Sequence, residues 1–238
     1  MDNVKSFLNY LKVYKNYSEL TIKNYYNDLT EFSIYIKKDL TRVKKEDIKS
    51  YLKYLFDKDN SNRTVSRKIS TLKSFYKYLK ENDVIKFSPA LSIKYPKADK
   101  KLPNFVHYNE LESMINATKK DTFYERDDLI IELMYATGVR VSELVNIKLD
   151  DIDFETNSIR ILGKGSYMRT VYFGEYARDA IFKYMHGLRK KLLNGKESEY
   201  LFLNKNGNNI TTRGIAKIID KIVSETEVKT KVSPHTLR

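Results

Sequence analysis

A helical spacing of apolar residues, repeated four times within the first 86 residues, most restricts the fold of this chain. The four sets are Val4, Phe7, Leu8 and Leu11; Ile22, Tyr25, Leu29, Phe32 and Ile36; Ile48, Tyr51, Leu52 and Leu55; and Val65, Ile69, Leu72, Tyr76 and Leu79. Steps of three and four place each set on one face of an α-helix. Ser18 and Ser61 stand before the second and fourth sets, where serine is a favoured N-cap. Residues 1–89 are therefore predicted to form a helical domain built on a four-helix bundle.

Positive charge is concentrated in this part of the chain. The formal net charge is +13, and residues 1–98 hold 21 Lys and Arg against 11 Asp and Glu. A basic half fits a polyanionic partner, because each neutralised phosphate releases condensed counterions. An AT-rich coding sequence also raises lysine content, so charge by itself leaves nucleic acid as one of two interpretations.

The fourth helix carries a basic stripe opposite its apolar face. The stripe consists of Arg63, Arg67, Ser70, Ser74 and Lys77, which step by three and four. Cations with small hydroxyls suit a phosphate backbone. The plainer interpretation is a solvated helix face, but the stripe lies in the half with the charge excess. We therefore predict that these five residues contact DNA.

The composition disfavours several other classes of protein. No apolar run approaches the roughly 18 residues of a membrane helix, and the N-terminus is amphipathic, unlike a signal peptide. The chain has no Cys, so disulfides and thiolate metal sites are not expected. We predict a cytoplasmic protein without a membrane partner, metal or cofactor.

A second domain is predicted after a linker over residues 90–104, which contains two prolines and several lysines. The second domain, residues 105–238, mixes helical and alternating patterns. Its expected elements are a helix around 109–117, a helix carrying Leu129, Ile130, Leu133 and Met134 and ending at Gly138, strands over 158–162 and 168–173 joined by a hairpin, a helix over 175–193, a short strand over 200–203, and a helix capped by Thr211 or Thr212.

Five ionisable residues of this domain suggest an anion site. Arg140 begins a helix after the cap Gly138, Glu143 shares its face, and Lys164 lies in a Gly-flanked hairpin. Near the end of the chain, His235 and Arg238 stand three apart, where Ser233 and Pro234 predict a helix start that favours an anion. Taken singly, these features are equally consistent with a helix ion pair, a solvated hairpin tip and a capping detail.

Taken together, the motifs resemble a known family. TGVRVSELVNI, then ILGKG with Arg169 and Val171 on the return strand, then SPHTLR, closely resemble the catalytic domain of tyrosine site-specific recombinases, of the bacterial Xer type and related phage integrases. YSELTIKNYYNDLTEFSIYI and SRKISTLKSFYKYL resemble the family's N-terminal SAM-like core-binding domain, and KLPNFVHYNEL resembles the join between the two. The resemblance implies a mainly α fold with a small antiparallel β-sheet in a mixed α/β catalytic domain.

The resemblance also implies roles for the charged residues. Arg140 and Arg238 would clamp the scissile phosphate, where planar guanidinium groups donate paired hydrogen bonds. Glu143 would orient Arg140, Lys164 would protonate the departing 5′-oxygen, and His235 would assist proton transfer or hold a phosphate oxygen. The implied partners are double-stranded DNA and further protomers, in a homo- or hetero-tetramer on paired DNA sites.

The chain departs from the family pattern at three places, of which the smallest is Ser88-Pro89 in place of the family's Asn-Pro. Ser166-Tyr167-Met168 follows the hairpin lysine where the family has a polar and basic run. Family members continue beyond the HxLR motif to a nucleophilic Tyr, and none of the 19 tyrosines here stands in that position. We therefore expect a truncated recombinase that binds DNA and the scissile phosphate without cleaving it. Two alternatives stay open: a non-catalytic DNA-binding accessory or competitor protein derived from a recombinase, and an unrelated helical regulator.

Overall fold

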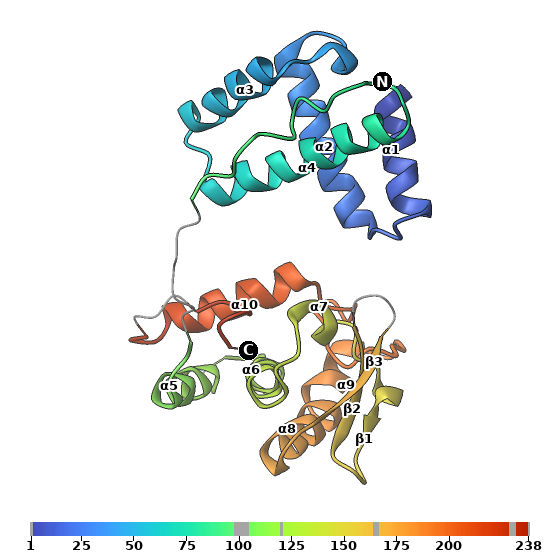
Figure 1. The fold of residues 1–238 in the computed structure, drawn as a ribbon. Helices are drawn as coiled ribbons and strands as arrows, with labels where there is room; N and C mark the ends of the chain where they lie inside the picture. The colour runs from blue at the N-terminus through green and yellow to red at the C-terminus, as the bar shows by residue number, and fades with distance from the viewer. Residues whose placement is uncertain (1, 98–104, 120, 164–166, 229–231, 238) are drawn as a thin grey trace. The chain divides into compact units, whose positions relative to one another are not determined.

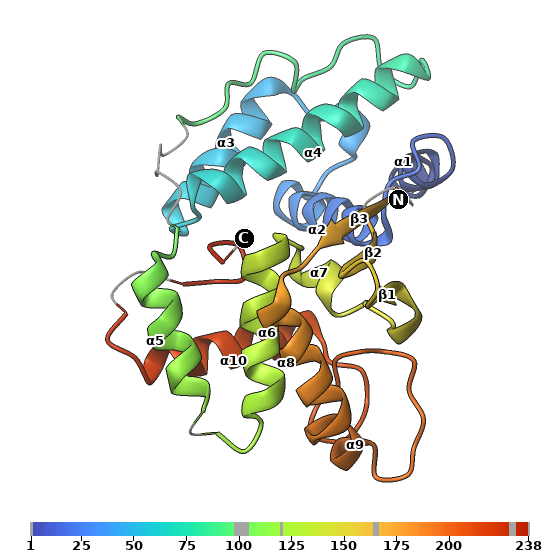
Figure 2. The ribbon, with the colours of Figure 1, turned by 90° about the horizontal axis from the view of Figure 1, so that it is seen from below.

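The chain divides between Lys101 and Leu102 into two units, Met1–Lys101 and Leu102–Arg238. The computed structural model describes residues 2–97, 105–119, 121–163, 167–228 and 232–237. Figures 1 and 2 show a helical first unit and a second unit in which helices pack beside a small sheet. The predicted fold class, mainly α with a small antiparallel sheet, is confirmed.

The first unit contains the four predicted helices and one 3₁₀ turn. These are α1 (Asp2–Val13), α2 (Glu19–Ile36), η1 (Leu40–Arg42), α3 (Lys45–Asp57) and α4 (Asn62–Glu81). Ser18 caps α2 by accepting a hydrogen bond from Thr21 N at 3.3 Å. Ser61 caps α4 in the same way, by accepting a hydrogen bond from Thr64 N at 3.2 Å. The predicted apolar positions supply most of the buried core. Within this core, the rings of Tyr51 and Phe32 are in edge-to-face contact.

A buried ionic network joins α2 to α4. Asp28, only 3% exposed, accepts hydrogen bonds from Thr71 Oγ1 at 2.9 Å and Lys68 Nζ at 3.3 Å, and it is also bonded to Arg67. Lys68 Nζ donates to Glu31 at 2.6 Å as well. Burying such charges costs free energy unless each finds a partner, so the register of α2 against α4 depends on these contacts.

The chain after α4 packs back along that helix. Ala90 and Ile93 are buried in the core of the first unit. Farther along, Asn62 Nδ2 donates to the carbonyl of Lys97 at 3.1 Å. The described part of the predicted linker therefore packs as part of the first unit, because Ala90 and Ile93 are buried in its core.

The second unit contains six α-helices in the described ranges and a three-stranded sheet. The helices are α5 (Tyr108–Thr118), α6 (Tyr124–Thr137), α7 (Val141–Leu144), α8 (Glu175–His186), α9 (Leu188–Leu193) and α10 (Thr212–Ser224), with the 3₁₀ turn η2 (Leu149–Asp151) between α7 and the sheet. The strands β1 (Ile152–Asp153), β2 (Ser158–Leu162) and β3 (Met168–Tyr172) pair antiparallel in the order β1-β2-β3. No helix in the described ranges is long and apolar enough to cross a membrane.

The prediction of one helix over 175–193 is wrong. The helix breaks at Gly187, whose φ is −97° and ψ −106°, and α9 starts at Leu188. The carboxylate of Glu125, from α6, accepts a hydrogen bond from Leu188 N at 2.6 Å. A side chain distant in sequence thus satisfies the N-terminus of α9 and stabilises the break.

Two shorter elements also differ from the prediction. In place of a strand over 200–203, there are two isolated bridges, Lys148 with Tyr200 and Leu203 with Asn209. The helix predicted from Ser233 is a turn over residues 234–236. Ser233 N donates to Thr236 Oγ1 at 2.7 Å, and Thr236 N donates to Ser233 O at 2.9 Å.

Candidate active site

Arg140 stands at a sharp junction between two helices. Helix α6 ends at Gly138, which has the left-handed φ of 60° that glycine adopts without a Cβ clash. Val139 is fully buried, and Arg140 follows as the extended N-cap of α7. The glycine turn and the buried valine therefore orient the backbone from which the arginine side chain leaves.

Glu143 is the central acceptor of the site. It is 7% exposed. Its Oε2 accepts from Arg140 N at 2.8 Å, and its Oε1 accepts from Arg140 Nη1 at 2.9 Å. Arg169 on β3 donates to the same two oxygens, from Nη1 to Oε1 at 3.0 Å and from Nη2 to Oε2 at 2.7 Å. One carboxylate therefore holds both arginines.

These contacts keep Glu143 ionised. The hydrogen bonds from Arg169, followed by those from the backbone and side chain of Arg140, outweigh burial and lower the pKa of Glu143 to about 2. The same pairing raises the pKa of Arg169. The carboxylate therefore stays charged at every physiological pH, as required of a group that orients cations.

The outer edge of Arg140 faces solvent. Its side chain is 47% exposed. Among the described residues, its Nε and Nη2 groups have no hydrogen-bond acceptor. A guanidinium held along one edge and open along the other can donate two parallel hydrogen bonds to an oxyanion.

Of the other three predicted catalytic residues, the structure describes only His235. His235 lies exposed in the turn over 234–236, and Val232 and Leu237 on either side of it are buried in the core that also contains Val139. In both views this terminal segment runs beside α6 (Figures 1 and 2). Lys164 and Arg238 lie outside the described residues.

The predicted DNA-contacting stripe runs along α4 with different surroundings at each position. Arg63, Arg67 and Lys77 are exposed, but Arg67 is bonded to Asp28, and Lys77 pairs with Glu81 at 3.6 Å.

The two serines of the stripe differ in exposure. Ser70 is exposed and Ser74 is half-buried. Ser70 Oγ donates to the carbonyl of Ser66 at 3.0 Å and lies 3.4 Å from the hydroxyl of Tyr95. Lys73 extends over the ring of Tyr95, 4.5 Å from its centroid. The stripe is therefore flanked by the aromatic side chain of Tyr95.

Arg169 is the site residue that we did not predict. Its position in the sequence could have indicated this role. Side chains of β3 alternate between the two faces of the sheet, and Arg169 pairs in register with the buried Ile161. A charged residue at an inward position of a sheet indicates a buried ionic partner. Only the fold identifies that partner as Glu143.

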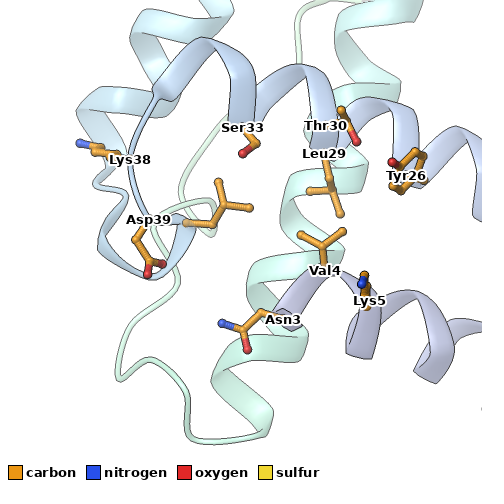
Figure 3. A pocket seen from close by; sticks show the side chains of 10 residues that line it. Asn3, Val4, Lys5, Tyr26, Leu29, Thr30, Ser33, Lys38 and Asp39 are labelled. Atoms are coloured by element: carbon orange, nitrogen blue, oxygen red, sulfur yellow. The ribbon is translucent and has the colours of Figure 1, made fainter. Parts of the chain in front are cut away.

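A pocket in the first unit lies apart from these residues in sequence. It is bordered by Val4 of α1, Tyr26 and Leu29 of α2, and Lys38 and Asp39 before η1 (Figure 3). Its lining mixes apolar side chains with isolated polar groups, as is ordinary where helix ends meet.

Comparison with known proteins defines the class. The sequence profile described as "Phage integrase family" matches residues 104–238, and that of "Phage integrase, N-terminal SAM-like domain" matches residues 4–83. The chain belongs to the phage integrase family. Within it, the chain is 40% identical over 238 residues to tyrosine recombinase XerC of Staphylococcus aureus (strain JH9), covering 98% of this chain and 79% of the relative. It is therefore a tyrosine recombinase of the Xer type.

Solved structures share the fold. The XerH site-specific recombinase bound to a difH substrate has a TM-score of 0.71 at 22% identity, covering 94% of this chain and 67% of that one. A lambda integrase tetramer bound to a Holliday junction has a TM-score of 0.79 at 14% identity, covering 99% of this chain and 67% of that one. Both of these neighbours are DNA complexes, and the second is a tetramer.

Proposed function

We propose that this chain acts in site-specific DNA recombination, and that it holds a scissile phosphate with Arg140, Lys164, His235 and Arg238. The observation that carries the proposal is the state of Arg140: one edge of its guanidinium is fixed by an ionised, buried Glu143, and the other faces solvent. A preorganised cation of this kind stabilises the charge that develops on phosphorus without reorganising during the reaction.

The remaining roles follow from family membership. Residues 1–89 would serve as the core-binding domain and 105–238 as the catalytic domain, acting in the cytoplasm on double-stranded DNA. Lys164 would protonate the departing 5′-oxygen and His235 would assist proton transfer. Arg238 would be the second clamping arginine, and Glu143 would orient Arg140. The recombinase would assemble as a homo- or hetero-tetramer on paired sites, and the lambda integrase neighbour, a tetramer bound to a Holliday junction, supports a tetrameric assembly.

The proposal separates phosphate binding from cleavage. In the family, strand exchange passes through a 3′-phosphotyrosine, and the nucleophilic Tyr follows the HxLR motif. Residues 1–238 are therefore expected to bind DNA without forming a covalent adduct.

The test uses a duplex selected by this chain from a random-sequence library. A nicked suicide derivative of the selected duplex is then incubated with residues 1–238 and resolved under denaturing conditions. We expect salt-sensitive binding, weakened at least tenfold by Arg140→Ala, with no adduct. A covalent adduct would refute the separation of binding from cleavage. Binding that is insensitive to salt and to Arg140→Ala would refute the phosphate site and favour an unrelated regulator.

A further inference from the structure

Arg169 connects three parts of the second unit. It lies on β3, and both of its terminal nitrogens donate hydrogen bonds to Glu143, which stands 26 residues earlier in the chain. Glu143 in turn bonds the backbone and the guanidinium of Arg140 at the start of α7. Helix α7 is a single turn of four residues, too short to hold its own direction by helix hydrogen bonds. Arg169 thus forms an ionic contact between this turn and the sheet.

The end of the β2–β3 ladder packs directly against the pair. Gly163 N donates to Tyr167 O at 2.8 Å, so the strands stay paired as far as these residues. A Cβ added to Gly163 would lie 3.4 Å from Arg169 Nη1 and 3.9 Å from Glu143 Oε1. Lys164 is the next residue in the chain. The carboxylate that orients Arg140 therefore lies close to Gly163, at the end of the ladder.

We propose that Arg169 is a positioning residue of the phosphate site, which holds Glu143 in the orientation that directs Arg140 and ties that orientation to strand β3. This inference rests on the proposed function of Arg140. In this proposal Arg169 acts through Glu143, to which both of its terminal nitrogens donate.

Removing Arg169 has two physical consequences. Glu143 would lose its two strongest donors and remain buried, so its carboxyl would hold a proton more readily. The carboxylate would keep only its two bonds from Arg140 and would lose the fork that holds its plane against β3. Arg140 would then sample several directions and lose its preorganisation for an oxyanion.

The test follows Arg140 directly by nitrogen-15 NMR of arginine side chains in the full chain, titrated with inorganic phosphate. The Arg140 signal is assigned from its disappearance in Arg140→Ala. A parallel carbon-13 titration follows the Glu143 carboxyl. The variants are Arg169→Gln, which keeps an amide donor but no charge, and Arg169→Lys, which keeps the charge but not the fork. Arg160→Ala is the matched control, because it removes an exposed arginine of the neighbouring strand whose partners among the described residues are Asp150 and Asp151.

With Arg169→Gln, we expect phosphate affinity at the Arg140 signal to fall about fivefold to tenfold and the Glu143 pKa to rise, since charge-assisted bonds are the strong ones. Arg169→Lys should recover the low pKa but only part of the affinity, and Arg160→Ala should change neither. If Arg169→Gln fails to fold, Arg169→Lys alone decides: wild-type affinity in that variant overturns the inference.

The outcomes distinguish the inference from the function on which it rests. If phosphate leaves the wild-type Arg140 signal unmoved, the proposed phosphate site is wrong, and the role of Arg169 fails with it. If phosphate binds at Arg140 equally well in wild type and Arg169→Gln, only the inference fails, and Arg169 serves stability alone.

Discussion

Glu143 accepts two hydrogen bonds from Arg140, one from its backbone N–H at 2.8 Å and one from Nη1 at 2.9 Å. The first bond satisfies a backbone donor at the start of α7, as the acidic residue of a capping box does. The second orients the guanidinium. The geometry of the helix start and the direction of the catalytic candidate are therefore determined by one buried carboxylate.

Glu143→Gln should destabilise the second unit in a pH-dependent way. Because the pKa of Glu143 is lowered to about 2, the ionised group contributes its stabilisation in full above the ordinary glutamate pKa. That stabilisation is lost as pH falls through the folded-state value. We expect a loss on the order of 3 kcal/mol at pH 7, shrinking progressively below about pH 4.5.

Urea denaturation of wild type and Glu143→Gln at several pH values measures the gap between their free energies of unfolding. Glu199→Gln is the control, because its partner Lys148 and Glu199 itself are both exposed, with side chains 45% and 56% accessible. Such a pair contributes little. A gap that stays constant down to pH 3 would contradict the assignment of the low pKa to Glu143.

Asp28→Ala should strongly destabilise the first unit. It removes the acceptor shared by Arg67, Lys68 and Thr71, and it leaves Lys68, with a side chain 6% exposed, bonded only to Glu31. Breaking a buried pair from one side typically costs about 3–5 kcal/mol. Hydrogen exchange of amides in α2 and α4 reports the loss within this unit.

Glu81→Ala provides the comparison for Asp28→Ala, because it removes an ion-pair partner from the same two-helix region. Glu81 pairs with the exposed Lys77 at 3.6 Å. Its removal should change exchange free energies by less than about 0.5 kcal/mol. Equal effects of the two substitutions would show that the buried network does not set the stability of the bundle.

Gly187→Ala should destabilise the junction between α8 and α9. A Cβ at this position would lie 2.8 Å from both Lys183 O and Glu125 Oε1, so the backbone or the capping carboxylate must move. The expected cost is about 1–3 kcal/mol, measured by thermal denaturation.

Gly174→Ala is the matched glycine substitution. A Cβ there meets nothing within 4 Å. The poorer N-cap residue and the reduced entropy of the unfolded chain nearly cancel, so the net change should stay within about 0.5 kcal/mol. A Gly187→Ala protein as stable as Gly174→Ala would mean that the junction relaxes freely.

Arg63→Ala should reduce DNA affinity and its dependence on salt. Arg63 is exposed on α4 and forms no ion pair with the described residues. Loss of one phosphate contact should lower the slope of log affinity against log salt by about 0.9. Fluorescence anisotropy at several salt concentrations measures it, with Lys12→Ala on α1 as the control; an unchanged slope for Arg63→Ala removes this residue from the interface.

Much of the fold was predictable because its signals are local. The caps Ser18 and Ser61, the glycine turn at Gly138 and the limits of β2 depend on residues within a few positions of each other. The motif around Arg140 and Glu143 was likewise recognisable, because the two residues lie one helical turn apart.

The errors arose where distant residues compete with local preference. The apolar pattern of 175–193 continues through Gly187. However, Glu125, which stands 63 residues before Leu188, accepts the hydrogen bond from Leu188 N that caps a new helix. Ala90 and Ile93 lie in a proline-containing stretch that resembles a linker, yet they complete the core of the first unit.

By itself, the sequence determined the helices, the hairpin and the family to which the chain belongs, since these depend on periodicity, caps and ordered motifs. Only the tertiary structure decided which charges meet: Arg169 with Glu143 across 26 residues, and Arg67 with Asp28 across 39. The physical reason is that an ion pair depends on distance and burial in space, and both are set by how the elements pack rather than by the residues adjacent in the chain.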